Sequence, residues 1–216
     1  MADGRKIILI GGYSGVGKNT FASSLQGRSD TQWMVLSKEP EIYALPQAVP
    51  YFETSFATSL KRTVAERLGI PLDQIEDLKD VPLDQGQQDR QRPHWHGVAA
   101  RVPTLRDVLI DEAAYWRSVN PTHYAAATHS IIAKEAPPGA TVLITDWRYP
   151  NEHTFYCNAY GPENVFTVRV IRGKYRRSTS DSEHALDAFV PDFLAVPHGS
   201  GPLAYYNGVW YSFKGF

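Results

Sequence analysis

A glycine-rich segment directly after an apolar run constrains the fold of this chain more than any other feature. The run Lys6–Ile10 reads K-I-I-L-I, and Gly12–Thr20 reads G-Y-S-G-V-G-K-N-T. The second segment has the pattern G-x-x-x-x-G-K, in which glycines let backbone N–H groups surround a phosphate and the lysine reaches the β- and γ-phosphates. We therefore expect a buried strand, a phosphate-binding loop and a helix, in that order. The alternative is a glycine-rich turn between a strand and a helix that binds no ligand.

The residue after the lysine departs from the usual pattern. Many such loops have Ser or Thr there, and its hydroxyl holds Mg²⁺. This chain has Asn19, which offers only an amide oxygen, while Thr20 supplies a hydroxyl one position later. The loop predicts a bound nucleoside triphosphate or a similar polyphosphate. Its expected ligand-binding residues are Gly12, Ser14, Gly15, Val16, Gly17, Lys18, Asn19 and Thr20.

Length and composition restrict the class of protein. The 216 residues are enough for one α/β domain with its own core, and the net charge of -1 predicts neither a broad nucleic-acid-binding surface nor a membrane-binding one. Cys157 is the single cysteine, which excludes an internal disulfide and is typical of a reducing compartment. No stretch approaches the roughly 20 apolar residues of a membrane-spanning helix. We expect one domain over residues 1–216, located in the cytoplasm.

Hydrophobic patterning predicts strands that alternate with helices. Apolar runs without alternation are typical of strands buried on both faces of a parallel sheet. Strands are expected at residues 5–10, 32–36, 141–146 and 165–171, and helices at 18–26, 55–68, 104–115 and 122–135. Together with the glycine-rich loop, this alternation predicts an α/β protein with the three-layer P-loop NTPase fold and a parallel sheet.

Two further segments have a distinctive composition. Residues 84–103 are polar and predict a mobile excursion from the fold. The aromatic stretch that contains Trp210 and Tyr211 predicts a last strand or a hairpin.

An aspartate stands at the end of a predicted buried strand. Asp146 closes the run T-V-L-I-T-D, where a carboxylate can hold Mg²⁺ directly or through water in a P-loop protein. The alternative is a helix N-cap, a position that Asp favours. The presence of the phosphate loop favours the metal role.

A basic run follows the strand predicted at 165–171. Residues 169–177 read R-V-I-R-G-K-Y-R-R, which places several cations close together. Arginines on a closing loop can neutralise the charge of a phosphoryl group in transfer and exclude water. A solvated basic surface is the alternative. After a strand of a P-loop protein, the run predicts a lid.

Five segments together resemble the phage-type deoxynucleoside monophosphate kinases and the related animal-type phosphomevalonate kinases. The loop ends G-K-N-T where that group typically has G-K-D-T, and Ile144–Glu152 reads I-T-D-W-R-Y-P-N-E, similar to the group's I-T-D-x-R-(F/Y)-P-N-E. The weaker matches are Ser55–Lys61 to F-A-x-x-L-K, Pro103–Leu109 to T-x-R-x-x-L, and Ser182–Asp187 to S-E-x-x-L-D. All five occur in the family's order.

This resemblance implies a nucleoside monophosphate kinase fold, with a parallel five-stranded core, a lid and a monophosphate-binding region. It implies ATP as the phosphoryl donor and Mg²⁺ as the metal. Because Asn19 replaces the group's usual Asp, Thr20 and Asp146 are the residues expected to hold this ion. Lys18 would bind the ATP phosphates. The acceptor's phosphate would meet Lys61, Arg106 and Arg148, with further substrate contacts from Asp146, Glu152 and Glu183. The lid, at about residues 172–183, would contribute Arg172, Arg176 and Arg177 as catalytic residues beside Lys18 and Arg148.

The function expected from the sequence is ATP-dependent phosphorylation of a nucleoside or deoxynucleoside monophosphate, a step of deoxynucleotide biosynthesis. The expected partners are these small molecules and neither a nucleic-acid polymer nor a membrane; a homodimer is left open. A viral origin, which the resemblance suggests, would place the protein in the host cytoplasm. One alternative is a different small-molecule phosphate kinase, such as phosphomevalonate kinase. Another is a nucleotide-binding switch or scaffold, although the guanine-selecting N-K-x-D is absent from the sequence.

Overall fold

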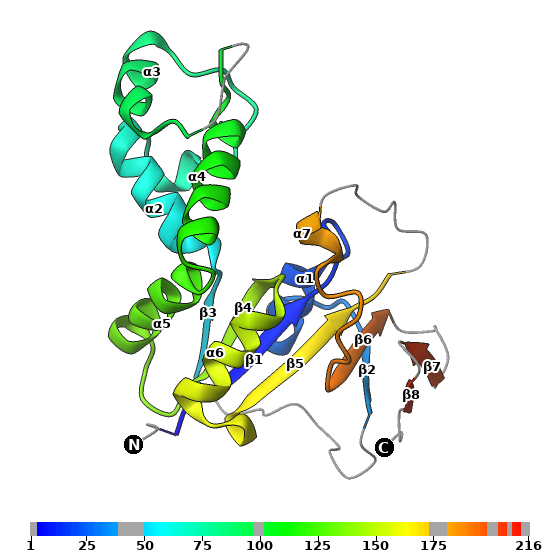
Figure 1. Ribbon diagram of the computed structural model, residues 1–216. Coiled ribbons are helices and arrows are strands. Elements are labelled where there is room, and N and C mark those ends of the chain that lie inside the picture. The colour runs from blue at the N-terminus through cyan, green and yellow to red at the C-terminus, as the bar shows by residue number, and fades with distance from the viewer. Residues whose placement is uncertain are drawn as a thin grey trace. The chain divides into compact units, whose positions relative to one another are not determined.

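The computed structural model describes residues 4–38, 50–96, 102–172, 181–197, 203–206 and 209–212. The chain forms two compact units (Figure 1). Residues 1–55 and 130–216 make up the sheet unit, and residues 56–129 make up the helical unit. The helical unit is therefore an insertion in the chain of the sheet unit. The expectation of one domain over residues 1–216 stays a prediction.

The sheet unit contains a mixed sheet that is mostly parallel. In the described residues its strands are β1 (Lys6–Gly11), β2 (Trp33–Ser37), β3 (Tyr51–Thr54), β4 (Thr141–Trp147), β5 (Val165–Val170), β6 (Phe193–Pro197), β7 (Leu203–Tyr206) and β8 (Val209–Ser212). Their spatial order is β3-β4-β1-β5-β6-β2-β8-β7. The run from β3 to β6 is parallel, and β2 is antiparallel to β6. The hairpin β7–β8 joins β2 through the pairing of Ser37 with Ser212.

The centre of the sheet is apolar on both faces because β1 is buried on both. Successive side chains of a strand point to opposite faces. Ile8 and Ile10 pack in one cluster with Phe21 of helix α1 (Lys18–Leu25). Ile7 and Leu9, which lie beside them in sequence, face the other side and are equally buried. The unbroken apolar run of β1 is thus explained by a helix layer on each face.

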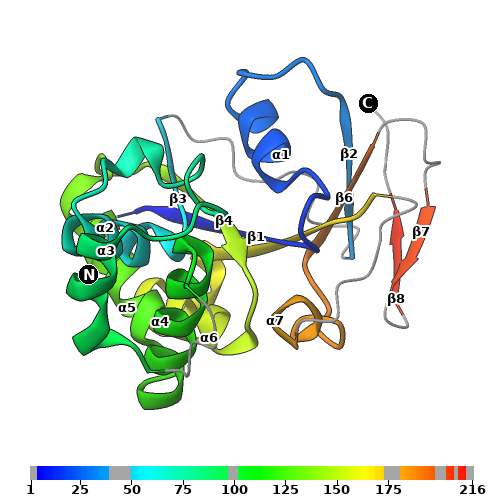
Figure 2. The same cartoon turned by 90° about the horizontal axis from the view of Figure 1, so that it is seen from above.

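Helix α6 (Pro150–Tyr160) provides the second layer. Figure 2 shows α1 and α6 on opposite sides of the sheet. Tyr156 and Tyr160 of α6 are buried, and their rings stack with a centroid distance of 5.9 Å. The sheet unit is therefore a three-layer α/β structure, as the alternation of predicted strands and helices indicated.

The helical unit consists of helices around an apolar core. It contains α2 (Ala57–Leu68), α3 (Gln85–Gln91), α4 (Leu105–Val119) and the first part of α5 (His123–Glu135), with short 3₁₀ turns at Leu72–Gln74 and Arg92–His94. Val64 and Leu68 of α2 are fully buried, as is Val108 of α4. Between the helices, Arg67 Nη1 donates to the Glu112 carboxylate at 2.9 Å, and both side chains are largely buried.

Residues 84–103, which were expected to be a mobile excursion, contain a helix in their first part. Residues 85–91 form α3, whose start is closed by a capping box: the Gln87 N–H donates to Asp84 Oδ1 at 2.8 Å, and the Asp84 N–H donates to Gln87 Oε1 at 3.0 Å. Reciprocal bonds of this kind satisfy backbone donors that a helix start leaves unpaired. Capping rather than apolar periodicity defines this helix, so its polar composition gave no sign of it, and the expected mobility of the segment stays a prediction.

The other predicted elements are confirmed, with small shifts. The first and last residues of each predicted strand differ by at most one position from those of an observed strand. The helix predicted at 104–115 continues to Val119. The C-terminal aromatic stretch forms the β7–β8 hairpin. Strands β3 and β6 and helix α6 were not predicted. No helix in the described ranges is long and apolar enough to cross a membrane.

Candidate active site

The predicted phosphate loop connects β1 to α1 at the carboxyl edge of the parallel strands. Gly12, Gly15 and Gly17 have φ angles of 150°, 78° and 97°, which residues with a side chain rarely adopt. A Cβ atom at Gly12 would lie 2.8 Å from the carbonyl oxygen of Val170 on β5. These three glycines therefore allow the tight turn of the loop, and no larger residue fits at Gly12.

Lys18 folds back over this loop. Its Nζ donates to the carbonyl oxygen of Gly12 at 2.8 Å and to that of Tyr13 at 2.9 Å. The ammonium group is thus held within the turn of the loop, at the N-terminal end of α1, where the helix adds partial positive charge. A fixed cation beside a helix N-terminus is an arrangement that favours binding of a phosphate.

The other expected loop residues fall into two groups. Ser14, Gly15, Asn19 and Thr20 are exposed, so a ligand can reach Gly15 and the side chains of the other three. Val16 is buried in the cluster under α1, so its side chain anchors the loop and only its backbone can contact a ligand.

Asp146 lies next to the start of the loop through an irregularity in the sheet. Leu9 of β1 is paired with Ile144, but Gly11 is paired with Trp147, so β4 has one residue more than β1 between these pairs. An extra residue of this kind, a β-bulge, changes the direction in which the neighbouring side chains point, and it is common beside active sites. Asp146 sits in the bulge, at the carboxyl edge where β1 runs into the loop. This residue is partly exposed.

The residues at this edge are chemically suited to Mg²⁺. This ion prefers oxygen ligands and usually takes only one or two from the protein, the remainder coming from phosphates and water. Asp146 offers a carboxylate and Thr20 a hydroxyl, while Asn19 offers an amide oxygen. In the described part of the chain no group of His, Cys, Asp or Glu forms a metal cage built from protein ligands alone. A few protein oxygens of this kind suit a metal that arrives with a phosphate ligand.

Arg148 follows β4 and is supported from two directions. Its backbone N–H donates to Glu152 Oε2 at 3.0 Å, and its Nη1 donates to Ser182 Oγ at 3.3 Å. Glu152 Oε2 also accepts from the Tyr149 N–H at 3.0 Å. The buried carboxylate of Glu152 thus caps the start of α6 and fixes the backbone that carries Arg148. This gives Glu152 a structural role, and its predicted contact with substrate stays a prediction.

A polar network that sequence reasoning missed lies beside the loop. Asp187 Oδ1 accepts from the Tyr13 hydroxyl at 2.7 Å and from Arg169 Nη2 at 3.1 Å. Asp187 Oδ2 lies 2.7 Å from Nδ1 of His184, in the short helix α7 (Asp181–His184). The guanidinium of Arg169 also lies over the Tyr13 ring, 4.9 Å from its centroid. Tyr13, Arg169 and Asp187 are far apart in sequence. The only signal for the network was that His184 and Asp187 both belong to the S-E-x-x-L-D match.

The predicted lid lies mostly outside the described residues. Arg172 is exposed just beyond β5, whereas Arg176 and Arg177 fall in the range 173–180, which the structure does not describe. Glu183 belongs to α7, but its side chain is also outside the described part of the chain. Arg169, the first cation of the basic run, is a buried residue of β5. The lid interpretation therefore does not extend to Arg169.

Lys61 and Arg106 both belong to the helical unit, and carboxylates of the turn after α2 pair with them. Lys61 Nζ lies 2.5 Å from Glu76 Oε1. Arg106 Nε and Nη2 donate to the two oxygens of Asp80 at 2.6 and 2.9 Å. Any phosphate bound by these cations would compete with Glu76 and Asp80. The predicted role of both residues in acceptor binding stays a prediction.

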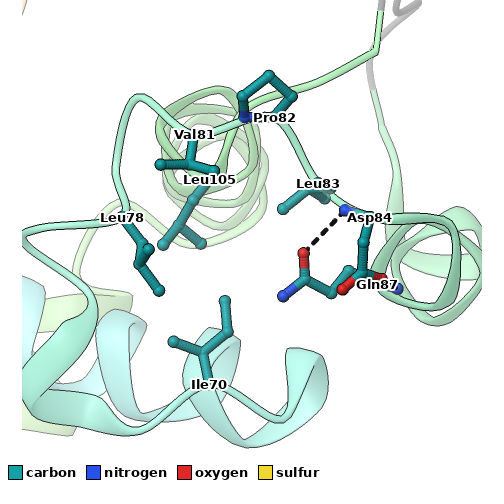
Figure 3. A pocket seen from close by; sticks show the side chains of 8 residues that line it. All are labelled: Ile70, Leu78, Val81, Pro82, Leu83, Asp84, Gln87 and Leu105. Atoms are coloured by element: carbon teal, nitrogen blue, oxygen red, sulfur yellow. Dashed lines mark hydrogen bonds between the residues drawn. The ribbon is translucent and has the colours of Figure 1, made fainter.

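The helical unit also has a pocket of its own (Figure 3), lined mainly by apolar side chains. Its lining residues are Ile70, Leu78, Val81, Pro82, Leu83, Asp84, Gln87 and Leu105. The polar members, Asp84 and Gln87, bond to each other in the capping box of α3. None of the site residues predicted from the sequence lines this pocket.

Comparison with known proteins adds no further assignment. The chain matches no protein-family model, and no curated protein sequence is significantly similar to it.

Proposed function

We propose that this chain is a kinase that transfers the γ-phosphoryl group of ATP to a nucleoside or deoxynucleoside monophosphate. The observation that carries the proposal is the closed loop at the end of β1, in which Lys18 Nζ is held by the carbonyl oxygens of Gly12 and Tyr13. The loop stands at the carboxyl edge of a parallel sheet, where α/β proteins bind their ligands.

The choice of a kinase rests on what surrounds this loop. Asp146 lies in the bulge of β4 and Arg148 directly follows this strand, which neighbours β1. The segment that contains them is also the most specific part of the resemblance to the phage-type monophosphate kinases. A carboxylate and an arginine beside a phosphate loop support transfer between two anions, since one can hold the metal and the other the acceptor.

The reaction needs no covalent intermediate with the protein. An oxygen of the acceptor monophosphate attacks the γ-phosphorus of ATP, the bond from that phosphorus to the bridging oxygen breaks, and ADP leaves. The acceptor oxygen is already an anion, so no strong general base is needed. Lys18 neutralises charge on the donor phosphates, and Arg148 holds and orients the acceptor phosphate. Mg²⁺, held by Asp146 and Thr20, would neutralise further charge on the phosphates.

The test is an assay that couples ADP release to absorbance, with ATP and a panel of ribo- and deoxyribonucleoside monophosphates. We expect one or a few monophosphates to raise ADP release at least about a hundredfold over the rate without acceptor, because a bound and oriented acceptor reacts much faster than water does. Phosphomevalonate belongs in the panel; turnover of this compound alone would assign the other small-molecule kinase. Slow ADP release that no acceptor accelerates would instead indicate a nucleotide-binding switch, and no ADP release or nucleotide binding at all would refute the proposal.

A further inference from the structure

The loop residue Tyr13 is held from outside the loop by three side chains. Its hydroxyl donates to Asp187 Oδ1 at 2.7 Å, and the guanidinium of Arg169 lies over its ring, 4.9 Å from the centroid. The His184 ring meets its edge at a centroid distance of 5.6 Å. The same residue, through its carbonyl oxygen, accepts a hydrogen bond from Lys18 at 2.9 Å. Tyr13 therefore joins the loop lysine to a network outside the loop.

Asp187 is the centre of this network. Its oxygens accept from the Tyr13 hydroxyl and from Arg169, and they lie within hydrogen-bond distance of His184. Burial opposes the charge of this carboxylate, but the hydrogen bonds from His184 and Tyr13 and the charge of Arg169 outweigh it, so the pKa of Asp187 lies below its ordinary value. The group is an anion near neutral pH and can act only as an acceptor.

Arg169 gives the network a rigid base. The residue is paired in register with Gly11, the last residue of β1 before the loop, and its side chain is only 4% exposed. A buried guanidinium needs a counter-ion, and Asp187 supplies it at 3.1 Å. The charge pair thus fixes the position of Asp187 relative to the strand from which the loop emerges.

The network also reaches the other half of the candidate site. Asp187 follows α7 closely, and its N–H donates to the His184 carbonyl oxygen at 2.9 Å. Ser182, in the same short helix, accepts from Arg148 at 3.3 Å. One short segment, residues 182–187, therefore contacts both the loop residue Tyr13 and the proposed acceptor-binding Arg148.

We infer that Asp187 is a positioning residue that holds the phosphate loop in its ATP-binding form through Tyr13. This inference rests on the proposed function and deepens it. Asp187 does not touch the reacting atoms. It keeps the Tyr13 carbonyl oxygen in the position where it accepts the hydrogen bond from Lys18 Nζ. It also connects Tyr13 to the segment 182–187, which contacts Arg148.

The experiment is calorimetric titration of ATP with Mg²⁺ into the full chain and its variants. Tyr13→Phe removes only the hydroxyl and is the variant least able to disturb folding. Asp187→Ala removes the acceptor and the counter-ion of Arg169, while Asp187→Asn keeps an oxygen that can accept from Tyr13. The double variant Tyr13→Phe/Asp187→Ala tests whether the two residues act through one link.

The matched control is Asp192→Asn, which changes another aspartate of the sheet unit. Asp192 Oδ1 is paired with a cation, Lys38 Nζ at 2.7 Å, and its Oδ2 accepts from the Thr167 hydroxyl at 2.7 Å. These partners lie just after β2 and on β5, so the control disturbs a similar carboxylate without removing the link to Tyr13.

We expect Tyr13→Phe and Asp187→Ala each to weaken ATP binding by about three- to tenfold, the scale of one hydrogen bond to a charged group with some exposure to solvent. The double variant should bind ATP no more weakly than Asp187→Ala alone, because the effects of substitutions within one network do not add. Asp187→Asn should regain part of the loss. The KM for the acceptor should change by less than about twofold in Tyr13→Phe, whereas a general loss of structure would affect both substrates.

Different outcomes separate this inference from the proposed function. If the wild-type chain binds ATP and both Tyr13→Phe and Asp187→Ala bind it equally well, the positioning role of Asp187 is refuted and the proposed function stands. The positioning role is also refuted, again without affecting the proposed function, if Asp192→Asn weakens ATP binding as much as Asp187→Ala does. If the wild-type chain binds no ATP, both the proposed function and this inference are refuted.

Discussion

Lys18 Nζ and the carbonyl oxygen of Gly12 lie 2.8 Å apart and are joined by a hydrogen bond across the loop. The lysine therefore closes the loop to which it belongs. Phosphate oxygens carry more negative charge than a carbonyl oxygen and attract an ammonium group more strongly. We expect a bound triphosphate to draw the ammonium away from Gly12 while the glycine backbone keeps its shape.

The first prediction concerns this lysine. Lys18→Ala should lower turnover by at least about a thousandfold, because groups that stabilise charge in the transition state contribute on this scale. The coupled ADP assay at saturating acceptor measures it. Lys134→Ala, which changes an exposed lysine of α5, is the matched control and should keep wild-type turnover. Near-normal activity of Lys18→Ala would show that the loop is not the donor site.

The second prediction separates the acceptor from the donor. Arg148→Ala should raise the KM for the monophosphate about tenfold or more while changing that for ATP far less, because a charge-assisted hydrogen bond to the acceptor is lost. Initial-rate kinetics with each substrate varied in turn measure both constants. A larger change in the KM for ATP than for the monophosphate would place Arg148 at the donor.

The third prediction concerns the support of Arg148. Glu152→Ala should lower the free energy of unfolding by about 1–3 kcal/mol, because the N–H groups of Arg148 and Tyr149 both lose their acceptor. Urea unfolding at neutral pH measures the change. Glu66→Ala, an exposed glutamate of α2, serves as control and should lie within about 0.5 kcal/mol of the wild type. An equal effect of the two substitutions would contradict the capping role of Glu152.

A fourth prediction concerns the helical unit and its buried ion pair. Burial opposes the charge of Glu112, but hydrogen bonds from Arg67 and Trp116 outweigh it and lower the pKa of Glu112. Glu112→Gln leaves the buried Arg67 guanidinium without its counter-ion, so it should reduce stability by about 3 kcal/mol near neutral pH.

The pH dependence of this difference follows from the direction of the shift. A carboxyl with a lowered pKa in the folded state contributes stability above its unfolded pKa, and the contribution is lost as the pH falls through the folded value. The gap between wild type and Glu112→Gln should therefore narrow as urea unfolding is repeated from about pH 7 down to about pH 3. A stability difference that grows as the pH falls would contradict a lowered pKa of Glu112 in the folded state.

The sequence predicted those parts of the fold that depend on local pattern. The apolar runs that became β1, β4 and β5 are buried on both faces, and the glycines of the loop have the backbone angles that only glycine adopts readily. Periodicity cannot show which strands are neighbours. β3 and β6 are short, and each is defined by its pairing with a partner distant in the chain, β4 for the one and β5 for the other.

Helices without a clear apolar stripe were missed for a different reason. α3 starts at a capping box between Asp84 and Gln87, and α6 starts with Pro150 in its first turn, with Glu152 accepting from the preceding backbone. Both starts carry readable signals, an acidic cap with Gln three residues later and a proline before a glutamate. The polar composition of one segment and the family motif in the other masked these signals.

The candidate site was predictable only in part. Lys18 and Asp146 could be identified because a motif and a strand end mark them. The link from Tyr13 to Asp187 spans 174 positions in the sequence and depends on β5 lying beside β1. No local pattern encodes such a contact, so only the folded chain reveals it.

Phosphoryl transfer is tested most directly by following phosphorus with ³¹P NMR while the chain turns over ATP and its best monophosphate. Transfer predicts that the ATP signals decline while those of ADP and of the acceptor's diphosphate grow in equal amounts, with little inorganic phosphate. Equal growth of ADP and inorganic phosphate, with the monophosphate unchanged, would contradict the claim that this chain is a monophosphate kinase.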